Sequence, residues 1–80
     1  MGKYVIQAIS RSDSMRAFKT LRASFIPRIG ETIDITGHHR PVTYVTHSPY
    51  GWAPIVTVDM SNSSDVEKLI SVYGWRRKQS

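Results

Sequence analysis

Short runs of β-branched and aromatic residues recur along this chain, and clusters of turn-forming residues separate them. The runs cover residues 3–9, 31–36, 41–47 and 55–60. Runs of this length at hairpin spacing predict β-strands. In the second run, Ile33 and Ile35 alternate with polar residues, which is typical of a half-buried strand. The first run has apolar residues at both odd and even positions and predicts a strand covered on both faces.

Residues 15–26 fit two secondary structures. As a strand, the segment places Leu21 and Phe25 on one face and Arg16 and Arg22 on the other. As a helix, it also gathers Leu21 and Phe25 within one stripe. We expect a strand, because a polar turn precedes the segment as in a hairpin and no glycine caps it before the next proline.

One helix is predicted near the end of the sequence. Ser64 and Glu67 have the spacing of a capping box, in which the hydroxyl accepts a backbone N–H and the glutamate reaches back to the cap. Apolar residues then recur at helical spacing in one stripe, which comprises Val66, Leu69, Ile70 and Tyr73. Gly74 lies where a left-handed C-cap is expected. Residues 75–80 are predicted to form a basic tail.

These elements together predict a mainly β (α+β) fold. We expect a small, strongly bent antiparallel sheet or SH3-like barrel of about five strands with one C-terminal helix. Eighty residues supply one core, so residues 1–74 are assigned to a single domain. The chain has no cysteine and must be held together by packing alone. It has neither a long apolar run nor a signal-peptide pattern, so we expect a cytoplasmic protein.

Residues 25–47 carry the motif Pro-x-x-Gly-Glu-x-Ile, then a glycine turn and Val-x-x-Val. This segment is similar to small SH3-like β-barrel proteins from uncharacterised phage and bacterial reading frames. The resemblance implies a turn between strands of such a barrel. It also implies a phage or mobile-element protein that binds a host component and acts in the cytoplasm of that host. It implies no shared activity.

Positive charge is concentrated in the first third of the chain. Eleven Lys and Arg residues against six Asp and Glu residues give a net charge of +5. Residues 3–28 hold six of the basic residues and only one acidic residue, Asp13, whereas residues 41–58 hold no charged residue. Clustered positive charge favours a polyanionic or acidic partner, because binding releases counterions. The alternative is that the charge serves solubility alone.

Aromatic residues form the first candidate binding site. Tyr50 and Trp52 lie in residues 47–54, where two prolines and a glycine predict a loop. Exposed Tyr and Trp side chains supply large contact areas at protein interfaces. The alternative is that Trp52 folds back as a lid over an open end of the sheet.

Basic residues form the second candidate site. Arg16 and Arg22 share one face of the predicted second strand, with Arg11 at the turn before it and Arg28 near its end. Guanidinium groups in this arrangement grip phosphates in bidentate fashion, while a ring of the aromatic loop stacks on a base. The alternative is an ordinary solvated strand face.

Catalytic and metal chemistry is not indicated. His38 and His39 are neighbours in a turn and His47 lies further along, with only Asp34 close enough in sequence to complete a ligand set. The chain has no nucleophile elbow, phosphate-binding loop or dinucleotide fingerprint. We therefore expect no metal, no cofactor, no small-molecule substrate and no enzymatic activity.

The leading prediction is a small non-enzymatic binding module of phage origin that inhibits or redirects a host protein. The aromatic loop is its anchor, and the basic face steers it toward an acidic surface of that protein. The uncharged middle of the chain suits an apolar interface core. The alternative is binding of single-stranded DNA or RNA through the same basic face. A structural role in virion assembly is a third hypothesis. A membrane partner is not expected.

Overall fold

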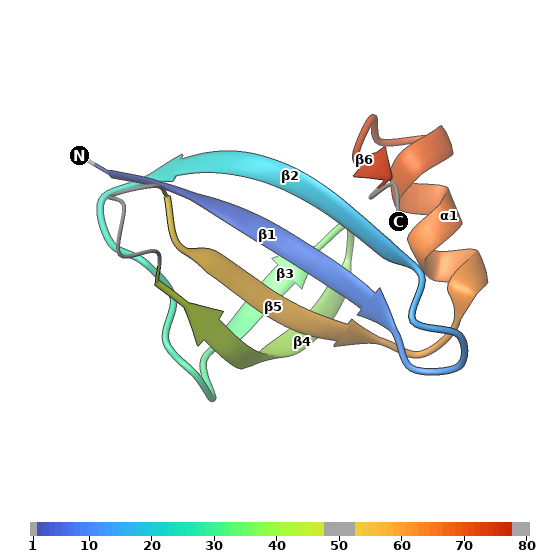
Figure 1. The fold of residues 1–80 in the computed structure, drawn as a ribbon, viewed down its shortest axis with the longest axis horizontal. Coiled ribbons are helices and arrows are strands. Elements are labelled where there is room, and N and C mark those ends of the chain that lie inside the picture. Colours follow the sequence, from blue (N-terminus) through green and yellow to red (C-terminus); the bar gives the residue numbers. More distant parts are fainter. Residues whose placement is uncertain (1, 48–52, 78–80) are drawn as a thin grey trace.

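The computed structural model describes residues 2–47 and 53–77. Over these residues the chain forms one curled sheet and one helix (Figure 1). The strands are β1 (Gly2–Ser10), β2 (Arg16–Ala23), β3 (Thr32–Ile35), β4 (His38–Thr46), β5 (Ile55–Met60) and β6 (Arg76–Arg77), and the helix is α1 (Ser63–Ser71). The predicted fold class, a mainly β domain with one C-terminal helix, is confirmed.

The sheet has six strands in the order β3-β4-β5-β1-β2-β6. The predicted sheet was wholly antiparallel, but β1 and β5 pair in parallel at its centre. All other neighbouring strands are antiparallel. Hairpin spacing reports only the pairing of strands that follow one another, so it gives no signal for two strands so far apart in sequence. The edge strands β3 and β6 do not pair with each other, and the sheet is a half-barrel (Figure 1).

Residues 16–23, within the segment that fitted both a strand and a helix, form strand β2 as predicted and pair with β1 in a hairpin. Cross-strand pairing runs from Gly2 opposite Ala23 to Ile9 opposite Arg16. The turn is closed by Asp13, whose carboxylate accepts the backbone N–H of Met15 at 3.2 Å. This bond is the main reason that the pKa of Asp13 lies below its ordinary value, since it favours the charged carboxylate.

The core lies on the inner face of the curled sheet. Side chains alternate along each strand, so one set of positions of β1 and β5 is buried while the other faces outward. The buried residues from β1 are Tyr4, Ile6, Ala8 and Ser10, and those from β5 include Val56, Val58 and Met60. Burial raises the pKa of the Tyr4 phenol, because the charged form loses hydration. Helix α1 packs Val66 and Leu69 against this core at one end of the sheet (Figure 1).

The helix begins slightly earlier than the capping-box prediction placed it. Asn62 is the N-cap, and its side-chain oxygen accepts the backbone N–H of Asp65 at 3.0 Å. Ser64, the predicted cap, lies within the first turn and donates its hydroxyl to Asn62. An asparagine side chain offers the same acceptor as a serine, so local sequence gives no preference between the two starts.

The segment predicted to be a basic tail belongs to the packed domain as far as Arg77. The helix ends earlier than predicted, because its C-cap is Val72 and Gly74 lies two residues beyond it. Gly74 has a φ of +75° and turns the chain back toward the sheet. Trp75 is then buried at 7% exposure and donates its backbone N–H to the carbonyl of Leu69. Arg76 and Arg77 form β6 beside β2. Residues 78–80 lie outside the described residues.

We predict that Trp75→Ala lowers the free energy of unfolding by about 3–5 kcal/mol, because it removes a large buried ring from a small core. Tyr73→Ala, two residues earlier at an exposed position, is the control and changes stability by less than about 1 kcal/mol. Urea unfolding followed by circular dichroism measures both. Equal effects of the two substitutions contradict the assignment of Trp75 to the core.

Candidate functional site on the outer face of the sheet

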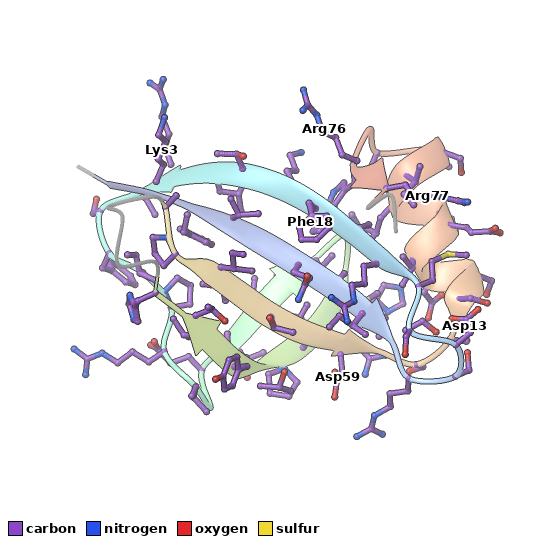
Figure 2. The ribbon with its side chains drawn as sticks, viewed as in Figure 1. Lys3, Asp13, Phe18, Asp59, Arg76 and Arg77 are labelled. Atoms are coloured by element: carbon purple, nitrogen blue, oxygen red, sulfur yellow. The ribbon has the colours of Figure 1, made fainter. Side chains whose placement is uncertain are left out.

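The outer face of β1, β2, β5 and β6 carries three of the six basic residues that lie between residues 3 and 28, together with Arg76 from the end of the chain. Strand register brings these charges together from distant parts of the chain. Lys3 lies opposite Arg22, Arg16 lies opposite Ile9, and Arg76 lies opposite Phe18. Lys3, Arg16, Arg22 and Arg76 on this side of the sheet are named here the basic face. Figure 2 shows Lys3 near one end of the molecule and Arg76 nearer the helix.

Negative charge is almost absent from these four strands. Asp59 is their one acidic residue. Its carboxylate lies 3.7 Å from the Arg11 guanidinium at the end of β1, and both side chains are partly exposed, so the ion pair is weak. Glu67 lies on α1 and pairs with Arg77, again at 3.7 Å. The basic face therefore keeps its positive charge largely unneutralised.

Two cations of the basic face oppose each other directly. Lys3 and Arg22 are cross-strand partners, and both are exposed. Like charges at directly opposite positions destabilise a strand pair, by an amount of the order of 0.2–1 kcal/mol. An arrangement that costs folding free energy is expected where it serves binding of a negatively charged ligand.

A row of residues crosses the outer face at the level of Phe18. Register places Arg76, Phe18, Gln7, Thr57 and Tyr44 side by side on β6, β2, β1, β5 and β4. The Gln7 amide donates to the Thr57 hydroxyl at 3.2 Å, which fixes the middle of the row. Phe18 is half-buried, whereas Tyr44 is 60% exposed. This row combines two aromatic rings, small polar groups and a guanidinium, a combination that binds the bases and phosphates of a single strand.

The predicted basic set is only partly brought together. Arg16 and Arg22 share the outer face of β2 as predicted, and Arg11 lies at the adjacent turn. Arg28 lies elsewhere, in the loop between β2 and β3, and lines a different groove. Tyr50 and Trp52 lie outside the described residues, so the aromatic-loop prediction stays a prediction.

Four residues of the site were not among the predicted ones: Lys3, Phe18, Tyr44 and Arg76. Lys3 had no local signal, because the apolar residues of residues 3–9 fall at both odd and even positions and do not show which face is outward. Arg76 had none, since it was assigned to a tail and reaches the face only through the pairing of β6 with β2.

A second surface lies at the end of the sheet opposite α1 (Figure 1). A groove of about 520 Å³ is lined there by Ile26, Pro27, Arg28, Ile29, Val45 and His47. Ile29 in this lining is 63% exposed, and Phe25, which precedes Ile26 in the chain, is 74% exposed. We call this surface the end groove. Its exposed apolar side chains and single guanidinium suit a protein contact.

The histidines are spread over different surfaces. His38 and His39 are exposed neighbours on β4, so their side chains project to opposite sides of the strand, while His47 lines the end groove. No three His, Asp or Glu side chains in the described part of the chain are grouped to hold a metal ion. Within the same residues, no helix is long and apolar enough to cross a membrane.

Comparison of the chain with protein-family models, curated proteins and solved structures gives no match in any of the three.

We predict that Arg22→Glu raises the free energy of unfolding by up to about 1 kcal/mol at low salt, because it turns a repulsive pair with Lys3 into an attractive one. The gain shrinks at high salt, where the charges are screened. Lys19→Glu is the matched control, since Lys19 lies on the other face of the same strand, opposite Ile6. Thermal unfolding at two salt concentrations measures both. A loss of stability in Arg22→Glu at low salt contradicts the proposed repulsion.

Proposed function

We propose that this protein binds single-stranded nucleic acid across the basic face. The observation that carries the proposal is the gathering of four cations on one side of the sheet, with Phe18 among them and Tyr44 on β4 at the far end of the same row. Phosphates need several cations along a path, and bases need exposed rings to stack on. Both requirements are met on the same surface.

The arrangement of the charges argues against solubility as their only role. Cations that serve solubility gain nothing from lying directly opposite one another, as Lys3 and Arg22 do. The acidic residues outside the turn at Asp13 are concentrated on α1 and around the β3–β4 hairpin, apart from Asp59. A charge asymmetry of this kind directs an anionic ligand to one side of the molecule.

The structure also removes one argument for a protein partner. The uncharged stretch of residues 41–58 suggested an apolar interface core. Its second part is β5, where Val56, Thr57 and Val58 are buried inside this domain. The lack of charge in β5 is therefore explained by folding, since β5 lies in the middle of the sheet.

Binding follows from the spacing of the side chains. Residues two apart on one strand face lie about 6.7 Å from each other, so Arg16, Phe18, Thr20 and Arg22 form a regular outward line along β2. The arginines grip phosphates through paired N–H donors, and Phe18 offers a ring between them. Stacking requires a free base face, which a single strand offers and a duplex does not.

We predict that the affinity for a short single-stranded oligonucleotide falls steeply with salt. Four phosphate contacts give a slope of about −2.8 in a plot of log K against log salt concentration, at about −0.7 for each contact. The double variant Arg16→Gln/Arg22→Gln reduces the slope to about −1.4. Fluorescence anisotropy with a labelled oligonucleotide measures it.

The control variant Arg28→Gln/Lys68→Gln removes the same charge from outside the basic face and keeps the full slope. Equal slopes for the two double variants show that net charge alone drives binding, and they overturn the proposal. Absence of oligonucleotide binding by the unaltered protein at low salt also overturns it.

A second candidate function is attachment to a protein through the end groove. The observation that favours it is the exposure of Phe25 and Ile29 beside a groove that also holds Arg28. Exposed apolar side chains with a guanidinium are typical of interface anchors. A partner with an acidic rim around an apolar anchor fits this surface.

We predict that Phe25→Ser/Ile29→Ser abolishes capture of any protein partner from a nuclease-treated cell lysate and leaves oligonucleotide affinity unchanged. Both residues are already exposed, so the fold is retained. The matched control is Tyr44→Ser, which removes an exposed ring from the outer face instead. A protein captured equally by the double variant does not use the end groove, and that result contradicts the second function.

A further inference from the structure

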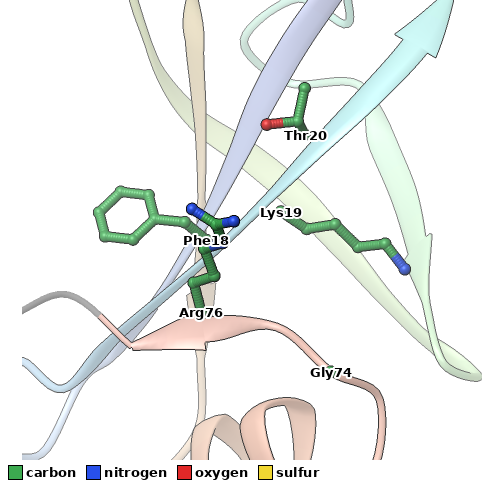
Figure 3. A pocket seen from close by; sticks show the side chains of 5 residues that line it. All are labelled: Phe18, Lys19, Thr20, Gly74 and Arg76. Atoms are coloured by element: carbon green, nitrogen blue, oxygen red, sulfur yellow. The ribbon is translucent and has the colours of Figure 1, made fainter.

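A notch opens at the edge of β2, beside the turn that leads into β6. It has a volume of about 320 Å³ and is lined by Phe18, Lys19, Thr20, Gly74 and Arg76. Figure 3 shows Phe18 and Lys19 extending to opposite sides of β2, with Gly74 in the turn that leads into β6. We call this cavity the notch.

The notch exists because β6 is short and the turn at Gly74 brings the chain to β2 only at Arg76 and Arg77. β6 pairs only with Ala17 and Phe18, and among the described strands none continues this pairing beyond them. Gly74 has a φ of +75°, and a Cβ built on it meets no heavy atom within 4 Å. The edge of β2 at Lys19 and Thr20 is thereby left open beside the notch.

The lining matches the parts of one nucleotide. Phe18 offers a ring for stacking, and Thr20 offers a hydroxyl that both donates and accepts hydrogen bonds. An open strand edge also presents backbone N–H and C=O groups, which can pair with the edge of a base. Lys19 and Arg76 each add a cation to the lining of the notch, and the lining includes no carboxylate. A planar base with its own phosphate satisfies all of these groups at once.

We infer that the notch holds the base that stacks on Phe18, which belongs to one nucleotide of the strand bound across the basic face. This inference rests on the proposed function and adds a position where the base itself is required. An extended acidic peptide also carries anions to a strand edge, but it leaves the aromatic ring without a stacking partner.

Gly74→Asn tests the inference. Asparagine tolerates a positive φ better than most residues, and its side chain takes up space that the glycine leaves open beside the notch. Gly37→Asn is the matched control, because Gly37 also has a positive φ and open space around it but lies in the distant β3–β4 turn. If both variants lose a similar amount of stability, a loss of affinity in Gly74→Asn alone is due to the side chain filling the space beside the notch and not to strain in the backbone.

The readout is affinity for a five-nucleotide strand and for versions with one base removed at each position. In the unaltered protein and in Gly37→Asn, removal of one particular base lowers affinity about tenfold, as expected for one stacked base. In Gly74→Asn, the intact strand binds about tenfold more weakly, and removal of that base has no further effect.

Other results overturn the inference. It fails if base removal lowers affinity equally in Gly74→Asn and the unaltered protein, or if all positions are equivalent, while the proposed function stands as long as the strand binds. If no strand binds, the proposed function itself fails. Binding of an acidic peptide that Gly74→Asn abolishes, with no base dependence, assigns the notch to peptides instead.

If Gly74→Asn does not fold, amide chemical shifts of the unaltered protein decide the question. Intact and base-deleted strands then give different shifts at Lys19, Thr20 and Gly74 if the base occupies the notch. Identical shifts at these three residues contradict it.

Discussion

The parallel pairing of β1 with β5 is the constraint on which the rest of the structure depends. It places the two strands at the centre of the sheet, with β2 and β6 on one side and β4 and β3 on the other. Because side chains alternate along these strands, Ile6 and Val56 face the core while Lys3 and Gln7 face outward. A core on one face and a charged surface on the other follow from this single pairing.

The two faces have opposite energetic roles. The inner face gains stability by burying Tyr4, Ile6 and Val58 in one cluster with Val66 and Leu69 of α1 and with Trp75. The outer face carries the Lys3–Arg22 repulsion and a half-buried Phe18, neither of which is the best choice for folding alone. A surface that departs from the rules of stable folding, on an otherwise consistent domain, is where a ligand site is expected.

Local sequence pattern was sufficient for some of these features and not for others. The two-residue repeat of a strand placed Arg16 and Arg22 on one face of β2. The 3.6-residue repeat of a helix predicted α1 from the spacing of Val66 and Leu69. The parallel centre, and the meeting of Lys3, Phe18 and Arg76, depend on pairing between distant segments, which no local pattern reports. Trp75 was misplaced because one apolar residue between a glycine and three cations gives no sign of burial.

The most direct test of nucleic-acid binding by the basic face is a map of backbone amide shifts as a single-stranded oligonucleotide is added to the unaltered protein. If the strand binds there, the largest shifts lie on the outer side of the sheet, at Lys3, Gln7, Phe18 and Arg76. Shifts confined to the end groove around Arg28 and Ile29, or spread evenly over the molecule, contradict it.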